Sequence, residues 1–287
     1  MNTTDCKRPP MNEYLTIPVS FKGYFPFRIG TTSYIYPDHI IPNIEMLAPF
    51  TDEIELVLFE SNTATNLPTD TEIEAMSRIR HDQNISYNIH LPIDIFLGDP
   101  HIDVREEGTR IVKKIIKDTY PLLPSTYTLH FSLLNRNGTM EKDIKSWCDR
   151  LRKSMEVILE TGIPPSQISI ETLSYPFEWV ERIVEDFGLS ICIDVGHLIL
   201  NKVDVQAYFT RYLSRTTVLH LHGVNDGHDH ASLSVLAKER LINIVENLKV
   251  FRETVSLEIF SYSDLVESLF SLKECWDKIS SKVNVTF

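Results

Sequence analysis

The stretch SICIDVGHL, residues 190–198, decides the fold of this chain. It starts as a short run of Ile and Cys residues, of the kind found in strands that are buried on both faces. The run passes directly into Asp194 and His197. A buried strand with ionisable residues at its carboxyl end is typical of a parallel α/β barrel, because the catalytic groups of such a barrel lie at that end.

Seven more runs of this type are spread along the chain, and amphipathic segments follow them. The strand-like runs cover residues 27–33, 53–59, 85–91, 127–131, 168–172, 216–223 and 254–260. Helical patterns cover, for example, residues 103–120, 140–161, 176–187 and 262–280. Eight strand-then-helix units predict an α/β protein with a (β/α)8 TIM barrel, and a doubly wound open sheet is the second possibility. We expect residues 27–287 to form one catalytic domain and residues 1–26 an N-terminal arm.

The composition is that of a globular protein, with 43% hydrophobic and 24% charged residues among 287. No stretch approaches the roughly 18 apolar residues that a membrane span needs, and the first residues lack the apolar run of a secretory signal. The four cysteines are scattered, without the CxxC spacing of a zinc knuckle. We therefore expect a cytoplasmic protein with no membrane partner, in a reducing compartment.

The formal net charge of −12 bears on the partners of the protein. Non-specific nucleic-acid binders neutralise phosphates with Lys and Arg and are usually basic. We therefore expect no nucleic acid as partner. A small phosphorylated substrate is compatible with the charge, because bound metal ions can be the largest local charges in a pocket.

Ionisable residues gather at the predicted strand ends. A lone histidine or carboxylate in such a place is usually a satisfied structural residue. Here six consecutive strands deliver such residues to one rim, and burying them without a counter-ion would be very costly. Imidazole and carboxylate are ligands of Zn, Mn and Fe, so the pattern predicts a metal cluster. Its members are His90, His130, Glu171, Asp194, His197, His220 and Glu258, with Asp229 and His230 in the loop after the seventh strand.

The chemistry of such a cluster depends on how many ions it holds. Glu171 lies between His130 and Asp194 in barrel order and could bridge two ions. Two ions about 3.5–4 Å apart clamp the oxygens of an in-line displacement at phosphorus and lower the pKa of bound water toward about 7. This favours phosphodiester hydrolysis. A single ion held by two Glu, one Asp and one His would instead suit an aldose–ketose isomerase.

Four stretches resemble the cobamide-remodelling phosphodiesterase (CbiR) family, within the apurinic/apyrimidinic endonuclease branch of the xylose isomerase-like barrels. They are FRIGTTSYIYPDHIIPNIEMLAPFTDEIELVLFES (27–61), YNIHLPIDIFLGD (87–99), CIDVGHL (192–198) and HLHGVNDGHDHASL (220–233). The resemblance implies hydrolysis of the nucleotide-loop phosphodiester of adenosylated cobamides, with release of cobinamide phosphate and an α-riboside for remodelling or salvage. A small-molecule cobamide is therefore the expected partner.

The resemblance also implies two or three divalent ions, which are Zn, Mn, Fe or Co. His90, His130 and Glu171 would hold the first, and Glu171, Asp194, His220 and Glu258 the second, with Glu171 and Glu258 serving catalysis as well. His197 and His230, with Asp229 or His228, would hold a third. The endonucleases have an aspartate at the position of His228, which leaves the ligands of this third ion open.

Four further residues are candidates for contact with the substrate: Tyr34, Glu60, His222 and His228. Tyr34 follows the first strand, where an aromatic ring would face a corrin, although packing at the rim is the plainer interpretation. Glu60 follows the second strand and is equally compatible with a solvated strand end. His222 shares the face of His220 by the strand period and would orient a phosphate.

Other functions remain open from the residues alone. A single-metal sugar or sugar-phosphate isomerase or epimerase would use Glu171, Asp194, His220 and Glu258, but it has less use for the additional histidines. A non-catalytic carrier on the same scaffold would be expected to have lost ligands. A DNA-repair role is disfavoured by the acidic charge, and the fold alone does not choose among these functions.

Overall fold

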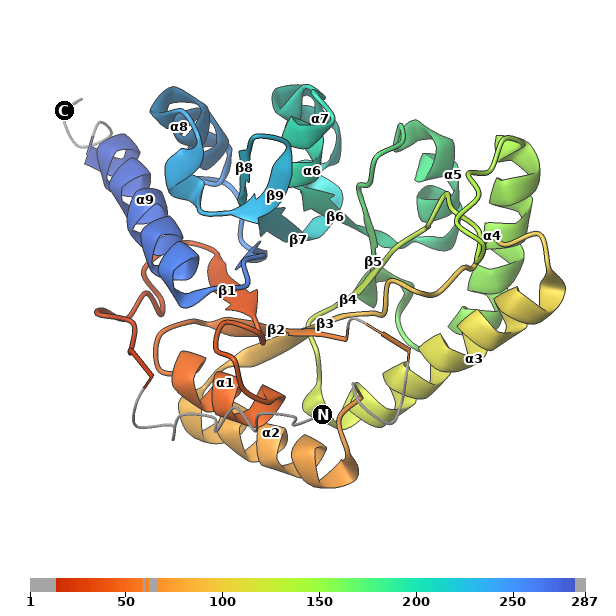
Figure 1. Ribbon diagram of the computed structural model, residues 1–287, viewed down its shortest axis with the longest axis horizontal. Coiled ribbons are helices and arrows are strands. Elements are labelled where there is room, and N and C mark those ends of the chain that lie inside the picture. The colour runs from red at the N-terminus through yellow and green to blue at the C-terminus, as the bar shows by residue number, and fades with distance from the viewer. Residues whose placement is uncertain (1–13, 59, 62–66, 282–287) are drawn as a thin grey trace, which may run out of the picture.

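The computed structural model of the chain describes residues 14–58, 60–61 and 67–281. Among them, eight parallel strands close into a barrel in the order β1-β10-β7-β6-β5-β4-β3-β2 (Figure 1). The predicted barrel is confirmed, and the open-sheet alternative is wrong. The strands are β1 (Arg28–Thr32), β2 (Glu53–Val57), β3 (Ser86–His90), β4 (Tyr127–Leu129), β5 (Ile168–Glu171), β6 (Ser190–Asp194), β7 (Thr216–Leu221) and β10 (Thr254–Leu257).

Helices surround the barrel (Figure 1). The helix expected over 140–161 begins only at Ile144, because the Asp143 side chain accepts from the Ser146 N–H at 3.1 Å and caps the helix there. No described helix has both the length and the apolar character needed to cross a membrane. The helices are α1 (Ile40–Leu47), α2 (Asp70–Gln83), α3 (Ile102–Thr119), α4 (Ile144–Leu159), α5 (Glu178–Phe187), α6 (Val195–Leu200), α7 (Val205–Tyr212), α8 (Lys238–Asn247) and α9 (Tyr262–Ser281).

Each strand divides its side chains between two environments, because successive residues point to opposite faces. In β2, Ile54 and Leu56 belong to the hydrophobic core, whereas Glu53 and Glu55 alternate with them and are equally buried. The Ser256 hydroxyl of β10 donates to Glu55, and the Asn88 amide donates to Glu53 at 2.9 Å. The apolar core therefore lies between the strands and the helices, and the barrel interior carries polar and ionisable groups.

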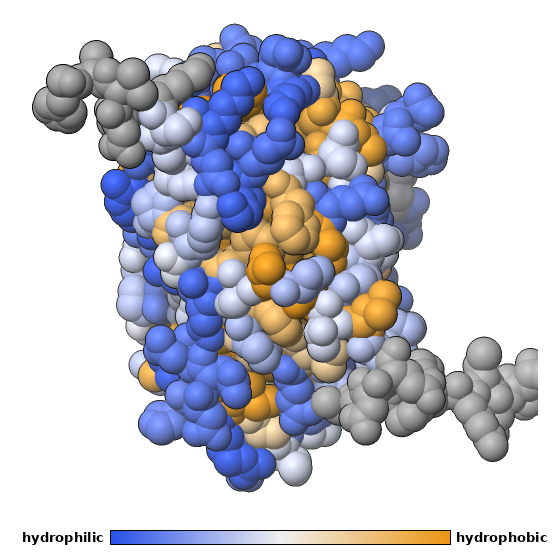
Figure 2. Space-filling view, turned by 90° about the vertical axis from the view of Figure 1, so that its left-hand side faces the viewer, coloured by the Kyte–Doolittle hydropathy of each residue, from blue (hydrophilic) through white to orange (hydrophobic). Residues whose placement is uncertain are grey.

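Residues 14–26 pack between the first and the last helix of the barrel. The Phe21 N–H donates to the Phe50 carbonyl at 3.0 Å, and the Phe21 ring meets the Phe270 ring edge-on at 5.7 Å. Phe21 is buried in the main core, whereas Leu15 and Val19 are exposed. Apolar side chains gather in the middle of this face of the molecule, bordered by hydrophilic ones (Figure 2). The described part of the predicted N-terminal arm thus covers the seam between α1 and α9; residues 1–13 lie outside the described residues.

The segment after the seventh barrel strand is a hairpin, although its sequence has the appearance of a loop. It consists of β8 (Gly223–Asn225) and β9 (His228–Ala231), which pair antiparallel. Asp226 and Gly227 form the turn with φ of 49° and 81°. Two consecutive positive φ values define a type I′ turn, for which Asp-Gly is a favoured pair. The hairpin carries Asp229 and His230 on its second strand, beside the rim of the barrel.

Candidate metal centre

The ionisable residues of the predicted cluster meet at the carboxyl ends of the barrel strands. His90, Glu171 and Asp194 are the last residues of β3, β5 and β6, and His130 directly follows β4. The parallel barrel brings these ends to one rim, although the residues are far apart in sequence. His90, Glu171, Asp194, His220 and Glu258 are buried, and His130, His197, Asp229 and His230 are partly exposed. The cluster thus has a closed floor and an open side.

Glu171 lies at the middle of the centre. Its Oε2 is 2.8 Å from His130 Nε2 and 3.1 Å from His90 Nε2. Its Oε1 is 3.3 Å from His197 Nδ1. One buried carboxylate therefore meets three imidazoles from three different parts of the chain, and both of its oxygens are engaged.

A second group lies beside the first and shares Glu171 with it. His220 Nδ1 is 3.1 Å from Glu258 Oε2, 3.8 Å from Glu171 Oε2 and 3.9 Å from Asp194 Oδ2. The four ligand atoms of this group lie within 4.8 Å of one another, as do those of the group formed by His90, His130 and Glu171. The structure thus brings together the two ligand sets implied by the resemblance.

A third group contains three histidines, His197, His222 and His230. The sequence predicts that His222 contacts the substrate, but its side chain is fully buried. Its Nε2 is 3.2 Å from Asp194 Oδ1, and its Nδ1 accepts from the His230 N–H at 2.9 Å. Asp229 is partly exposed, with Oδ2 3.7 Å from His197 Nε2. His228 is exposed at the start of β9, and the structure does not bring it into the group.

Gly196 makes room for this third group. A Cβ atom at this position would overlap the imidazole ring of His222. Gly196 lies in the first turn of α6, which begins at the rim because the Asp194 side chain accepts from the His197 N–H at 2.7 Å. The motif Asp-Val-Gly-His therefore places an acid and an imidazole in the centre and leaves space for a second imidazole between them.

Unpartnered polar atoms test whether this centre fits metal ions. Both ring nitrogens of His220 and Oε2 of Glu258 are buried and make no contact with hydrogen-bond geometry in the described residues, although Nδ1 lies 3.1 Å from Glu258 Oε2 and Nε2 lies 3.1 Å from Glu55 Oε1. Buried polar atoms normally have partners, and leaving them unsatisfied costs about 1–3 kcal/mol each. Imidazole nitrogens and carboxylate oxygens at this spacing are a donor set for divalent ions. The residues present therefore fit bound ions.

The buried imidazoles and carboxylates of the centre shift one another's pKa values toward the charged forms. Burial alone would lower the pKa of His90, but Glu171 together with Glu55 and Glu258 outweighs burial and raises it to about 9. Burial also opposes charge on His197, and Asp194 with Glu171 raises its pKa to about 10. Burial would raise the pKa of Glu171, yet His130 and His220 hold it well below its usual range. Without ions, Glu171 is thus charged and His90 and His197 are protonated at neutral pH.

We expect the affinity for divalent ions to rise with pH. The stabilising contribution of His90 and His197 in the ion-free protein is fully present below their ordinary pKa of about 6.5 and is lost as pH rises through about 9 to 10. Ions need the neutral imidazoles and must displace these protons. The apparent affinity should rise about tenfold per pH unit for each displaced proton, up to about pH 9. Titration calorimetry in buffers of different ionisation enthalpy counts the protons, and an affinity that is flat between pH 7 and 9 contradicts this assignment.

Glu55 also lies in the centre, and the strand-end pattern of the sequence does not predict it. Its Oε1 is 3.1 Å from His220 Nε2, from the opposite side of the barrel. Glu55 lies in the middle of β2 and not at its end, so the strand-end criterion passes over it. The signal was the alternation of Glu53 and Glu55 with Ile54 and Leu56, because a strand covered by helices turns its polar face into the barrel.

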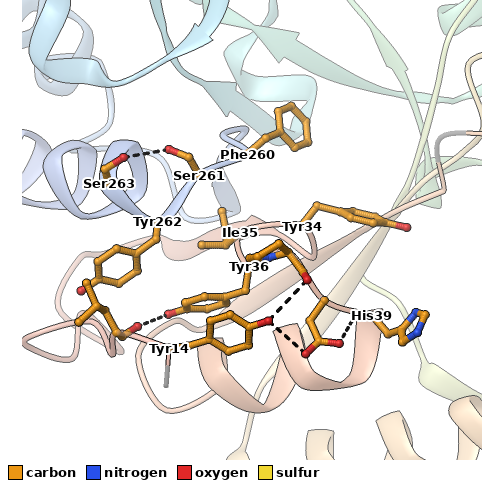
Figure 3. A pocket seen from close by; sticks show the side chains of 12 residues that line it. Tyr14, Tyr34, Ile35, Tyr36, His39, Phe260, Ser261, Tyr262 and Ser263 are labelled. Atoms are coloured by element: carbon orange, nitrogen blue, oxygen red, sulfur yellow. Dashed lines mark hydrogen bonds between the residues drawn. The ribbon is translucent and has the colours of Figure 1, made fainter. Parts of the chain in front are cut away.

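A cavity of about 790 Å³ opens at the carboxyl ends of β1 and β10, and aromatic side chains line much of it. Tyr34 and Phe260 lie on the side nearer the centre of the barrel, and the rings of Tyr14, Tyr36 and Tyr262 lie together on the other side (Figure 3). The Phe260 ring is 5.1 Å from the His230 ring, so the cavity adjoins the third group. Glu60 is exposed beyond β2 and is not among the lining residues.

The comparisons with known proteins agree with the fold. Residues 51–277 match the family described as xylose isomerase-like TIM barrel. No curated protein matches the sequence. Among solved structures, a D-tagatose 3-epimerase-like protein is similar, with a TM-score of 0.74 and 18% identity over 90% of this chain and 100% of the other.

Two further structures share the barrel. Endonuclease IV from Thermus thermophilus is similar at a TM-score of 0.64 and 15% identity, over 88% of this chain and 99% of the other. The IOLI protein with a bound zinc atom is similar at a TM-score of 0.64 and 13% identity, over 89% and 99%. At these identities the likeness is one of fold.

Proposed function

This chain belongs to the xylose isomerase-like TIM-barrel family, and from that premise we propose that it is a metal-dependent phosphodiesterase acting on cobamides. The proposed reaction cleaves the nucleotide-loop phosphodiester into cobinamide phosphate and an α-riboside. The buried histidine and carboxylate groups are consistent with divalent ions, and they supply the chemical basis of the proposal. The stretches that resemble cobamide-remodelling phosphodiesterases supply the substrate.

The observation that carries the proposal is the shared position of Glu171. Its carboxylate belongs to the group with His90 and His130 and also to the group with His220 and its acidic partners. A carboxylate so placed is suited to hold two ions side by side. When bound, such ions polarise the phosphate oxygens and lower the pKa of water, so that hydroxide is available for attack on phosphorus near neutral pH.

The partly exposed side chains mark where the phosphodiester would approach. His130 and His197 are each 18% exposed, and His230 is 27% exposed, whereas Glu171 beneath them is closed to solvent. A phosphate bound on this side would meet the imidazoles and one carboxylate, Asp229, and would avoid the buried carboxylates Glu55 and Asp194, which would repel it. Glu171 and Glu258 would hold the centre in place from below.

The aromatic cavity is suited to bind a large, flat portion of the substrate. Its volume of about 790 Å³ lies within the range of small-molecule sites. Tyr34 and Phe260 would contact this portion between the ions and the outer rings. The acidic net charge of −12 fits a compact substrate better than a nucleic acid. A cytoplasmic location would accompany this role in cobamide salvage.

A single-ion sugar isomerase or epimerase is the second candidate. The group of Glu171, Asp194, His220 and Glu258 would suffice for one ion, and an epimerase-like structure is among those similar in fold. Such an enzyme would not need the additional imidazoles at His90 and His130. It would also release no phosphate monoester.

The proposal predicts cleavage of adenosylcobalamin by the purified protein in the dark. With Zn, Mn, Co or Fe supplied, mass spectrometry should find cobinamide phosphate and the α-riboside. In heavy-oxygen water, one labelled oxygen should enter the new phosphate, because the metal centre directs water to phosphorus. Label in the riboside alone would mean cleavage on the carbon side. Intact cobamide after exhaustive incubation with all four metals would leave the proposal without support, and turnover of a ketose would favour the second candidate.

A further inference from the structure

We propose that Glu55 is a positioning residue of the metal centre. It engages the Nε2 side of the His220 imidazole, so that the ring presents Nδ1 to the ion held with Glu171, Asp194 and Glu258. This inference rests on the ion-binding part of the proposed function and is independent of the identity of the substrate.

The two nitrogens of His220 face different partners. Nδ1 faces the rim, where Glu258 Oε2 is 3.1 Å away and oxygens of Glu171 and Asp194 lie within 4 Å. Nε2 faces Glu55 Oε1 at 3.1 Å. The ring nitrogens of an imidazole lie on opposite sides, so an ion bound at Nδ1 leaves Nε2 for a separate partner. Glu55 occupies that place.

The surroundings of Glu55 leave its second oxygen for His220. The side chain is completely buried, and Oε2 accepts from the Ser256 hydroxyl. Oε1 makes no contact with hydrogen-bond geometry in the described residues, and an imidazole nitrogen, His220 Nε2, lies 3.1 Å from it. A buried carboxylate without a compensating positive or hydrogen-bonding group is very costly. An imidazole whose proton is kept on Nε2 compensates it.

Histidine ligands of metals usually donate their second N–H to a carboxylate or a carbonyl, which fixes the tautomer and makes the ligating nitrogen more basic. The 3.1 Å separation of Glu55 Oε1 from His220 Nε2 is short enough for this arrangement once the ring aims its N–H at the carboxylate. Because β2 and β7 are not neighbours in the barrel, the contact also crosses the interior and ties the floor of the centre to the opposite wall.

Glu55 could instead bind an ion directly. Atoms of Glu55, His90, His220 and Glu258 also lie within 4.8 Å of one another. If such an ion is held at Nε2 of His220, beside Glu55, it takes the place of the proton that the proposed arrangement keeps there. The two possibilities therefore differ in the number of ions bound at saturation and in whether Nε2 of His220 carries a proton or a metal ion.

The test compares Glu55→Gln with Glu53→Gln. Glu53 is a suitable control because it lies two residues earlier on the same face of β2, is equally buried, and meets Asn88, Ser86 and Arg28 but no histidine. Each protein is titrated with Co²⁺ alone, and binding is followed by the visible spectrum of the ion and by competition with a chelator. Ion content at saturation is counted by elemental analysis.

We expect Glu55→Gln to bind as many ions as the unmodified protein, with one of them weakened by about 10–100-fold and altered in its visible spectrum. Glu53→Gln should match the unmodified protein. Unchanged affinity and spectrum in Glu55→Gln overturn the proposal. The loss of one whole ion at saturation also overturns it, in favour of direct ligation. If the unmodified protein binds no Co²⁺ at all, the failure belongs to the metal centre itself and not to the role of Glu55.

A measurement on the unmodified protein keeps the proposal testable if Glu55→Gln does not fold. In the Zn²⁺-loaded protein labelled with ¹⁵N, the ring signals of His220 are identified by their absence in His220→Asn. We expect a proton on Nε2 and a metal-shifted Nδ1. The reverse pattern, with Nε2 bound to metal, contradicts the proposal.

Discussion

Replacement of Glu171 by glutamine should reduce cobamide hydrolysis by more than about 100-fold. Even the loss of a residue that only supports a metal ligand commonly lowers metal affinity or activity by about 10–100-fold, and Glu171 would contact the ions themselves. Its Oε2 lies 2.8 Å and 3.1 Å from His130 and His90, and its other oxygen faces His197. Glutamine has the same shape but only one carbonyl oxygen and no charge, so it would not hold two ions.

Two readouts separate this effect from misfolding. Circular dichroism and thermal unfolding show whether the Glu171→Gln protein is folded, and elemental analysis shows whether its ion content has fallen. Glu53→Gln is the matched control, since Glu53 is buried in the same barrel without contact to an imidazole. Near-normal turnover by a folded Glu171→Gln protein refutes the central place of this carboxylate.

Removal of the ions should abolish turnover completely, and addition of a single divalent metal should restore it. Removal of the ions should also destabilise the fold, because a ligand present at about 1,000 times its dissociation constant stabilises the native state by about 4 kcal/mol. At roughly 2–4 °C for each kcal/mol, the melting temperature should fall by on the order of 10 °C. The groups left behind are those of the closed floor, where Glu258 and His220 lie 3.1 Å apart but make no contact with hydrogen-bond geometry within the described part of the chain.

The control for this experiment is the same chelator saturated with metal, which should change neither activity nor melting temperature. The comparison is made at one pH, because protons replace ions at His90 and His197 as pH falls. Full turnover in protein that has lost its ions would contradict metal-dependent catalysis.

The sequence predicted the barrel and most of the cluster because both depend on local patterns. Asp194 ends β6 and caps α6 with its own side chain, so strand end, helix start and two candidate ligands lie within a single short motif. The rule that strand ends meet at one rim then extends to His90, His130 and Glu171. These inferences need the order of the strands but no knowledge of side-chain packing.

The remaining features depend on contacts between distant segments. Glu55 reaches His220 across the barrel interior, and no local sequence pattern predicts that these two residues are in contact. The place of His222 depends on the hairpin, which folds back so that the His230 N–H meets its ring. A short segment of polar residues and glycine has the appearance of a loop, because such short strands contain no apolar alternation.

The number of divalent ions bound to each chain tests the shared position of Glu171 most directly. The protein would be purified without chelator, dialysed against metal-free buffer and analysed for Zn, Mn, Fe and Co against an accurate protein concentration. We predict at least two ions per chain, because the groups around His90 and around His220 both use Glu171. One ion or fewer per chain, with no further uptake when metal is supplied, would contradict the multi-ion centre and with it the proposed phosphodiesterase.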